Sequence, residues 1–388
     1  MTKMTRLRVC NIISGAGWGG AERVVSLLLG GIRSRDLDVA VVVFNEGQLA
    51  DTVRDLGIRV HVCAEGGRTF LSLCHSLRVW LSVNKFDVIH VHGYKELAVV
   101  IAASCGHLKT TLVTVHGLQP WTQITLGGAL KYWGFMIFAR LLGGWFVAVS
   151  QEIELRLRSA LRTDRVFRIS NPVPLQSREE TGRDIRSIVG WPSGMKLVGF
   201  VGRLELVKGP DLLLTAATLC APGIGFVFVG DGSMKAALND VVRSNCLESR
   251  VRFLGHVPEA IGYIAGLDLL AVPSRHEGLP MVLLEAALCG VPVVAFDVGG
   301  VREVLDGSPC AQLISCGDVQ EFARAIDRTV TGKEEIREAI VAWSNSVRAK
   351  FSLKAAVESY LALYVKIAAN NTITSGYGSQ TDASSTFR

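Results

Sequence analysis

The chain has 388 residues, of which 49% are hydrophobic and 20% charged, so it is long enough for two globular domains and too apolar to be intrinsically disordered. No uninterrupted apolar run could span a bilayer, and the N-terminus lacks the apolar core of a signal peptide. The formal net charge is +6, and the residues up to Glu180, with 21 Lys/Arg against 14 Asp/Glu, predict an anionic partner for the first half.

Cysteine and basic-residue patterns exclude several classes of protein. The nine cysteines form no C-x-x-C pair and no His/Cys cluster with zinc spacing, which predicts free, mostly buried thiols in a reducing cytoplasm. No dense Lys/Arg block with interleaved aromatics is present, so the sequence does not favour a nucleic acid as the partner.

The first half of the chain alternates apolar strands with helical stretches. The predicted strands are residues 7–13, 39–44, 59–63, 88–92, 111–115, 146–149 and 166–169. Their near-continuous Val, Ile and Leu runs indicate strands that are buried on both faces of a parallel sheet. Residues 21–33 and 70–83 are predicted helices between them. This alternation is typical of a doubly wound α/β domain.

The second half repeats the pattern after a polar stretch, residues 174–190, that predicts a linker. The predicted strands are residues 197–201, 226–229, 251–253, 267–272, 293–296 and 312–314. The predicted helices are residues 211–220, 281–289 and 354–369. The tail from 370 onwards is rich in Ser, Thr, Gly and Asn, which predicts disorder.

Two carboxylates flank a predicted helix start in the second half. Residues 273–292 read PSRHEGLPMVLLEAALCGVP, with Glu277 before Pro280 and Glu285 after it. A proline lacks only an N–H that a helix start leaves unpaired, so Pro280 predicts a helix N-terminus, whose free N–H groups suit a phosphate. Carboxylates repel phosphate but accept hydrogen bonds from sugar hydroxyls. The segment therefore predicts a nucleotide-sugar site.

Two cations follow a predicted buried strand earlier in the same half. Residues 202–209 read GRLELVKG, between the strand 197–201 and a helix that Pro210 opens. This position is the carboxyl edge of a sheet, where α/β domains bind ligands. Arg203 and Lys208 can neutralise a diphosphate there, although two solvated surface cations would give the same local pattern.

Together these motifs resemble glycosyltransferase family 4, the retaining enzymes of the GT-B architecture. The resemblance is strong over residues 197–305, in GRLELVKG, GDG at 230–232, FLGHV at 253–257 and SRHEGLPMVLLEA at 274–286. It is weaker in GWGGAERVV at 17–25 and at His116 with Gly117. It implies an α/β fold with two Rossmann-like domains, whose parallel sheets face each other across a cleft.

The resemblance also implies how the chain is divided. Residues 1–174 would form the N-terminal Rossmann-like domain for the acceptor, and residues 183–348 the C-terminal domain for the nucleotide-sugar donor. A helix at 351–369 would cross back to the N-terminal domain, and 370–388 would be a disordered tail.

Roles in the family carry over to the matching residues of the second half. Arg203 and Lys208 would hold the donor diphosphate and stabilise charge on the leaving nucleotide. Glu277 would accept hydroxyls of the donor sugar, and Glu285 would accept those of the ribose. The turn whose backbone would meet phosphate and sugar oxygens consists of Gly278, Leu279, Pro280 and Met281.

The remaining contacts that the resemblance implies lie elsewhere. Val257 matches the position whose backbone reads the base. Gly19 and Gly20 would let a helix start of the first domain approach the phosphates. His116 matches a histidine that lies near the transferred sugar. The family retains the anomeric configuration, and the usual proposal is a front-face route in which the leaving phosphate helps to deprotonate the acceptor.

Two other functions remain as alternatives. Residues 15–20 fit G-x-G-x-x-G after a strand, and Glu46 follows the next strand, as in an NAD-dependent Rossmann enzyme. That alternative leaves both glutamates and both cations of the second half without a role. A non-catalytic protein that only binds sugar nucleotides would share every motif. Neither a cofactor nor a metal is expected, because Asp36-Leu37-Asp38 spells D-x-D at the amino edge of a strand, away from the ligand edge.

Histidines and aromatics of the first half allow further interpretations. His90 and His92 alternate along one strand and share a face, which favours core or cleft-lining histidines over a metal pair. Residues 132–138 read YWGFMIF, which predicts a buried helix, or alternatively a patch that contacts anionic lipid near a lipid-linked acceptor. The predicted location is cytoplasmic, with peripheral contact to the inner membrane as an option.

Overall fold

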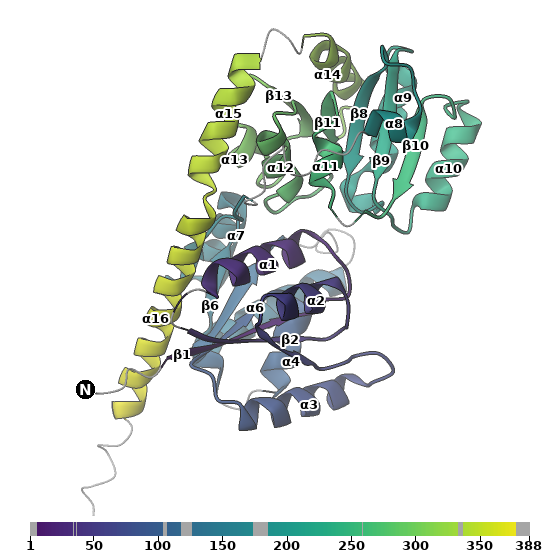
Figure 1. Ribbon diagram of the computed structural model, residues 1–388. Helices are drawn as coiled ribbons and strands as arrows, with labels where there is room; N and C mark the ends of the chain where they lie inside the picture. The colour runs from purple at the N-terminus through teal and green to yellow at the C-terminus, as the bar shows by residue number, and fades with distance from the viewer. Residues whose placement is uncertain are drawn as a thin grey trace, which may run out of the picture. The chain divides into compact units, whose positions relative to one another are not determined.

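Two parallel sheets organise the chain in the computed structural model, which describes residues 6–33, 35, 37–103, 107–117, 126–173, 185–257, 259–332 and 337–377 (Figure 1). The chain divides into two compact units. The first unit is Met1–Pro172 with Leu353–Arg388, and the second unit is Val173–Ser352.

The first unit is built on a seven-stranded sheet with the order β3-β2-β1-β4-β5-β6-β7. All neighbouring strands are parallel. Three central strands, β4 to β6, are buried along their whole length, because helices flank them and their residues are almost all apolar. The strands are β1 (Leu7–Ile13), β2 (Leu37–Val43), β3 (Arg59–Val62), β4 (Val88–Val91), β5 (Thr111–Val115), β6 (Trp145–Ala148) and β7 (Val166–Arg168).

Helices α1 and α2 bury their apolar stripes against β1 and β2. Val25 and Leu29 of α1 lie in one cluster with Ile13 and Val41, and all four are at most 2% exposed. Helices α3, α4 and α6 contact one another in that order. The helices of this unit are α1 (Gly20–Ile32), α2 (Gln48–Asp55), α3 (Phe70–Val83), α4 (Tyr94–Ala103), η1 (His107–Thr110), α6 (Leu126–Leu141) and α7 (Gln151–Leu161).

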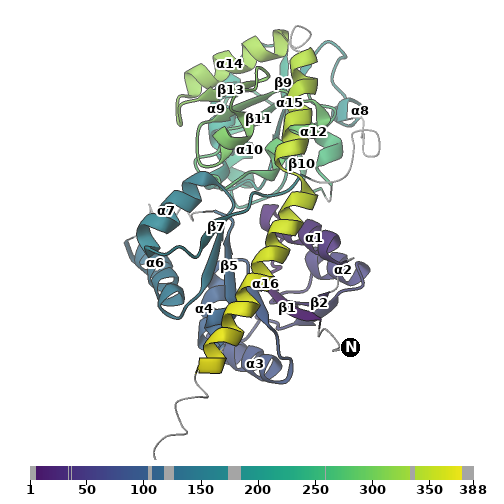
Figure 2. The same cartoon turned by 90° about the vertical axis from the view of Figure 1, so that its left-hand side faces the viewer.

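The C-terminal helix α16 (Leu353–Tyr377) packs on the first unit, beside α1 (Figure 2). Gly31 permits this approach, since a Cβ there would lie 2.6 Å from Cγ2 of Val357. Tyr364 places its hydroxyl 2.7 Å from Nδ1 of His90, deep in the sheet. One helical turn earlier, the Tyr360 hydroxyl lies 3.2 Å from Oγ1 of Thr114. These buried polar contacts fix the register of α16 on the sheet.

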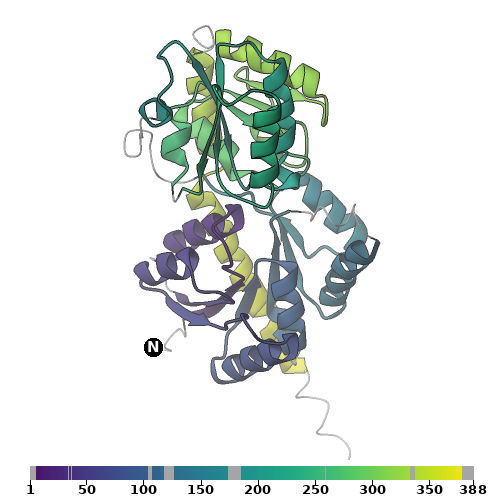
Figure 3. The ribbon, with the colours of Figure 1, turned by 90° about the vertical axis from the view of Figure 1, so that its right-hand side faces the viewer.

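The second unit contains a six-stranded parallel sheet with the order β10-β9-β8-β11-β12-β13. This is the order of a doubly wound Rossmann-like sheet, and helices lie on both of its faces (Figure 3). The strands are β8 (Lys196–Val201), β9 (Ile224–Val229), β10 (Val251–Gly255), β11 (Leu269–Val272), β12 (Val293–Phe296) and β13 (Ala311–Ile314).

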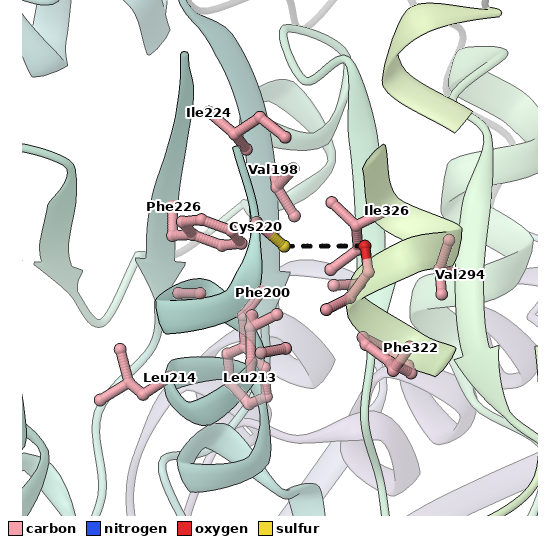
Figure 4. Close-up of a cluster of buried hydrophobic side chains, with 14 of the residues drawn as sticks. Val198, Phe200, Leu213, Leu214, Cys220, Ile224, Phe226, Val294, Phe322 and Ile326 are labelled. Carbon is pink, nitrogen blue, oxygen red and sulfur yellow. Dashed lines mark hydrogen bonds between the residues drawn. The ribbon is translucent and has the colours of Figure 1, made fainter. Parts of the chain in front are cut away.

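One face of this sheet carries a large apolar core under α9, α10 and α14 (Figure 4). Phe200 of β8 lies beside Leu213 of α9, Phe226 of β9 lies beside Cys220, and Phe322 of α14 belongs to the same cluster. Cys220 also lies there, with its Sγ 3.7 Å from the Ala323 carbonyl oxygen. The helices are α8 (Ile185–Val189), η3 (Leu206–Lys208), α9 (Pro210–Leu219), α10 (Lys235–Ser244), α11 (Ile261–Ile264), α12 (Met281–Cys289), α13 (Val301–Leu305), α14 (Val319–Thr331) and α15 (Arg337–Lys350).

Two segments differ from the sequence prediction. Helix α8 falls within the predicted linker, because Ile185 and Val189 sit four residues apart and both are buried. Helix α16 continues to Tyr377, into the segment predicted to be disordered, because extending an existing helix adds a hydrogen bond for each residue that it orders. Residues 174–184 and 378–388 lie outside the described residues.

Candidate functional site

The candidate site lies in the second unit, where the strand order changes direction. β8 and β11 are neighbours in the sheet although two other strands separate them in the chain. The connections leave these two strands toward opposite sides, and ligands of doubly wound sheets bind beyond the carboxyl ends of such strands. The loop after β8 carries Arg203 and Lys208, and the loop after β11 carries Glu277.

The structure brings Lys208 and Glu277 together across 69 residues of sequence. The Lys208 Nζ donates to both carboxylate oxygens of Glu277, at 2.7 and 2.8 Å. Ser274 donates its hydroxyl to the same carboxylate, at 2.7 Å from Oε1. The Glu277 side chain is only 6% exposed and that of Lys208 28%. A buried carboxylate needs such donors to offset its lost hydration. Lys208, Ser274 and Glu277 thus form one polar centre.

A second ion pair holds the two loops in place, and sequence analysis missed it. The Arg275 guanidinium binds both carboxylate oxygens of Asp211, at 2.8 and 2.6 Å. Arg275 also donates its backbone N–H to the Val207 carbonyl oxygen at 2.9 Å. The Asp211 contact raises the pKa of the arginine above its ordinary value. No motif marks this pair, because it depends on β8 and β11 being neighbours.

The N-terminus of α12 follows Glu277 closely in the chain. Pro280 is the N-cap residue, with φ of −72° and ψ of 121°, so the helix begins one residue later than the proline. The structure records no acceptor for the backbone N–H of Gly278 or Met281 among the residues it describes. Glu285 lies on the second turn of α12 and is 1% exposed. Leu279 is also buried and anchors the turn.

Gly299, in the loop after β12, packs closely against the backbone of the Glu277 turn. Gly299 has a φ of +56°, and a Cβ there would lie 1.9 Å from the Glu277 carbonyl oxygen. The next residue, Gly300, donates its N–H to the Gly278 carbonyl oxygen at 2.8 Å. The Gly299-Gly300 pair in the loop after a predicted strand was a signal that sequence analysis could have used.

Two expected site residues of the second unit, Arg203 and Val257, make no recorded hydrogen bond or ion pair with this centre among the described residues. Arg203 is exposed, and its guanidinium makes no ion pair with any residue in the described part of the chain. Val257 follows β10, the edge strand two places away from β8. A contact between the Gly230 N–H and the Gly255 carbonyl oxygen, at 2.8 Å, joins the intervening strand ends.

In the first unit, Gly19 and Gly20 form the start of α1, as the glycine pattern predicts. Gly19 is the N-cap residue, and Gly20 is the first residue of the helix. The Gly19 N–H donates to a carboxylate oxygen of Glu22 at 3.1 Å, so an acidic side chain of the same helix already caps this end.

His116 follows β5, beside the carboxyl ends of β1 and β4. Its Nε2 lies 3.2 Å from Nδ1 of His92, and Nε2 of His92 lies 3.0 Å from Oδ1 of Asn11. Burial lowers the pKa of His116 to about 4. Burial, together with the neighbouring imidazoles, also puts the pKa values of His90 and His92 well below their ordinary range. All three rings are therefore neutral at pH 7.

These buried imidazoles should make the first unit acid-sensitive. The unfolded chain binds a proton at His116 below pH 6.5, whereas its folded pKa is about 4. Between these values the unfolded state binds more protons, so stability is fully present above pH 6.5 and falls as the pH falls. The His116 contribution is about 3 kcal/mol. We expect His116→Asn to flatten the pH dependence of the urea midpoint.

His75 provides the control for this measurement, because it is exposed on α3. His75→Gln should leave the pH dependence of the wild type unchanged. An unchanged profile in His116→Asn as well would contradict the assignment.

The D-x-D sequence is only partly described, and its Asp38 is held in ion pairs with arginines. Within the described ranges no three His, Cys, Asp or Glu side chains are grouped as metal ligands. Asp38 starts β2 and pairs with Arg8 and Arg59, at 3.1 and 3.5 Å, and Asp36 lies outside the described residues. Six of the eight described cysteines are buried, and all eight are free thiols.

The aromatic segment of the first half lies in α6 and is only partly buried. Met136 is 1% exposed, but Ile137 and Phe138 are 42% and 46% exposed. The predicted helix is present but is buried on one side only, because this stretch is apolar around more of the helix than its neighbours cover. The side chains of Tyr132 and Phe135 lie outside the described residues. No described helix is both long enough and apolar enough to cross a membrane.

Comparisons with known proteins match both halves of the chain. Residues 182–343 match the family model for group 1 glycosyl transferases, and residues 18–177 match the model for glycosyltransferase family 4. The chain is 34% identical over 299 residues to a 2-deoxystreptamine N-acetyl-D-glucosaminyltransferase of Streptomyces fradiae, which covers 70% of this chain and 68% of that protein. The chain belongs to the group 1 glycosyltransferases.

Two further proteins resemble this glycosyltransferase. A D-inositol 3-phosphate glycosyltransferase of Corynebacterium jeikeium is 32% identical over 239 residues, or 57% of each protein. The crystal structure of Anabaena HepE in complex with UDP-glucose has a TM-score of 0.77 and 21% identity, over 92% of this chain and 100% of that one. The expected enzyme class and the α/β fold class of GT-B are thereby confirmed.

Family membership also bears on the NAD-dependent alternative. That alternative needs Glu46 as the acceptor for ribose hydroxyls, but Glu46 is exposed and pairs with Arg54 at 2.9 Å.

Proposed function

We propose that this glycosyltransferase moves a sugar from a UDP- or GDP-sugar to a hydroxyl of a glycan or lipid-linked acceptor, with retention of anomeric configuration. The observation that carries the proposal is the Lys208–Glu277 pair at the switch point of the second sheet. A cation that suits a diphosphate and a carboxylate that suits sugar hydroxyls lie side by side, as a ligand that joins a sugar to a diphosphate requires.

The proposed chemistry uses groups that are already oriented. The bond between the anomeric carbon and the β-phosphate oxygen breaks, and its electron pair stays on the diphosphate. Lys208, with Arg203 and the N-terminus of α12, stabilises that negative charge. The acceptor oxygen bonds to the anomeric carbon on the same face, and its proton passes to the departing phosphate. No metal or cofactor is required for these steps.

The remaining site residues position the donor. In the proposal Glu277 binds sugar hydroxyls, Glu285 binds the ribose and the backbone at Val257 meets the base. The turn Gly278, Leu279, Pro280 and Met281 presents backbone groups to phosphate and sugar oxygens. In the first unit, the residues proposed to bind substrate are Gly19, Gly20 and His116.

A small polyhydroxylated acceptor is a second candidate. The names of the two curated relatives specify 2-deoxystreptamine and D-inositol 3-phosphate, which are cyclic polyols rather than polymers. A lipid-linked or glycan acceptor would instead place this enzyme in bacterial cell-surface polysaccharide or lipopolysaccharide synthesis. The same transfer chemistry serves both classes, so the acceptor must be found by assay.

A donor panel tests the proposed function. Purified protein is incubated with UDP- and GDP-sugars and both acceptor classes, and the released nucleoside diphosphate is measured. We expect transfer from one donor, and we expect Glu285→Ala to reduce it at least tenfold. Tight donor binding without any release would favour the non-catalytic alternative. Tight NAD binding with no sugar-nucleotide binding would favour an NAD-dependent enzyme.

The remaining part of the proposal is a cytoplasmic location with peripheral contact to the anionic inner membrane. Helix α6 exposes Leu130, Ile137, Phe138 and Leu141 near the basic Arg140. Exposed apolar side chains with nearby cations suit an anionic lipid surface. In sedimentation with anionic liposomes at low salt, the wild type should be found in the liposome pellet. The double variant Phe138→Ser with Leu141→Ser should stay in the supernatant. A wild type that stays in solution would reject the membrane contact.

A further inference from the structure

A row of polar side chains crosses three neighbouring strands of the first unit. Asn11 lies on β1, His92 follows β4 and His116 follows β5, and these strands are adjacent in the sheet. Asn11 is 4% exposed and His92 5%. Because alternate residues of a strand point to one face, His90 and His92 share a face, and their ring centroids are 4.0 Å apart.

The contacts in this row determine where each proton lies. A neutral imidazole has one N–H donor and one acceptor nitrogen. With its amide oxygen toward the ring, Asn11 accepts from Nε2 of His92 at 3.0 Å. Nδ1 of His92 is then an acceptor, so the contact of 3.2 Å requires His116 to donate from Nε2. His116 consequently keeps an unprotonated Nδ1.

The last acceptor of this hydrogen-bonded row is Nδ1 of His116, and it is buried. Nδ1 of His116 is buried and has no hydrogen-bond partner among the residues that the structure describes. Burial lowers the pKa values of His90, His92 and His116, so all three rings are neutral at pH 7. Nδ1 of His116 therefore stays unprotonated. An acceptor nitrogen in this position can receive a hydroxyl hydrogen but cannot donate to a phosphate.

We propose that Asn11 and His92 are positioning residues that hold His116 in the Nε2–H tautomer, so that its Nδ1 accepts a hydrogen bond from a hydroxyl of a bound substrate. This inference rests on the proposed function for the identity of the hydroxyl. It adds two residues, both absent from the expected site, whose role is to set the proton on a third. Such partners commonly fix the tautomer and orientation of a functional histidine.

The neighbouring polar network has a different role. His90 binds the hydroxyls of Tyr364 and Thr114, each at 2.7 Å, and these contacts hold α16 on the sheet. Tyr364→Phe removes one of them without touching Asn11, His92 or His116. This variant therefore serves as the structural control: it should lower the urea midpoint and leave the tautomer of His116 unchanged.

The test is long-range 15N–1H NMR of the full chain with labelled histidine at neutral pH. The signal that disappears in His116→Asn identifies His116. The wild type should carry the proton on Nε2. His92→Asn places an amide oxygen where Nδ1 was, so it should preserve that tautomer and most of kcat. His92→Gln places its amide near the Nε2 position instead, so His116 should become a mixture of tautomers and kcat should fall about tenfold.

Either of two results would overturn the inference. One is a wild-type His116 protonated on Nδ1. This tautomer results if the Asn11 amide nitrogen, rather than its oxygen, faces the His92 ring. The other is an equal loss of kcat in His92→Asn and His92→Gln with the tautomer unchanged in both. The tautomer is read without substrate, so an Nε2–H signal supports the network even if no donor is turned over, and the missing turnover then rejects the proposed function alone.

Discussion

Replacing Lys208 by alanine is expected to lower kcat/KM for sugar transfer at least tenfold. Its Nζ is the cation closest to the Glu277 carboxylate, and in the proposed mechanism it stabilises the leaving diphosphate. A tenfold loss corresponds to about 1.4 kcal/mol, within the range of one hydrogen bond to a charged group. Steady-state kinetics with the donor found in the panel provide the measurement.

Part of this loss should come from Glu277 itself. Without Lys208 the carboxylate, whose side chain is 6% exposed, loses the cation that compensates its burial. The double variant Lys208→Ala with Glu277→Gln should therefore lose less free energy of unfolding than the sum of the losses in the two single variants. Lys235→Ala is the matched control, since Lys235 pairs with Asp231 at 2.7 Å in the same unit but both side chains are exposed. Equal kinetics in Lys208→Ala and Lys235→Ala would contradict the site.

Gly299→Ala is expected to cause the largest loss of stability at the site, several kcal/mol. The new Cβ would lie 1.9 Å from the Glu277 carbonyl oxygen and 2.8 Å from its carbon, so the backbone of the Glu277 turn must move. Activity should fall together with the urea midpoint, because the displaced turn carries Glu277 away from Lys208. Urea unfolding and donor turnover of the same preparation measure both effects.

Gly307 separates the steric effect from the backbone effect. It also has a positive φ, +71°, but a Cβ there would meet nothing within 4 Å. Gly307→Ala should cost only the strain of a left-handed backbone, about 1 kcal/mol, and should leave turnover unchanged. Equal losses of stability in Gly299→Ala and Gly307→Ala would contradict this prediction, because they would show that the Glu277 turn moves at little cost.

Much of the fold could be predicted because the apolar runs are long and uninterrupted. The bounds of β1, β5, α3, α12 and β12 agree with the sequence prediction. Strand ends elsewhere move by one or two residues, as hydrogen bonding at the edge decides them. The extension of α16 to Tyr377 could not be predicted, because the composition of that stretch favours disorder and only the helix before it supplies a template.

The candidate site was predictable in its residues but not in its geometry. Lys208 and Glu277 were identified by residue type and by their place after a strand. Their contact depends on β8 and β11 being neighbours, which no local pattern determines. The Arg275–Asp211 pair escaped notice for the same reason. His92 and Asn11 were beyond reach as partners of His116, because the register of three strands sets those distances.

A crystal structure with a bound, non-transferable UDP- or GDP-sugar analogue tests the central claim most directly. The account predicts the diphosphate within hydrogen-bond distance of Lys208 Nζ and the N-terminus of α12, with sugar hydroxyls on the Glu277 carboxylate. Well-defined density for the nucleotide at another place, with the Lys208–Glu277 pair undisturbed and remote from it, would contradict the account.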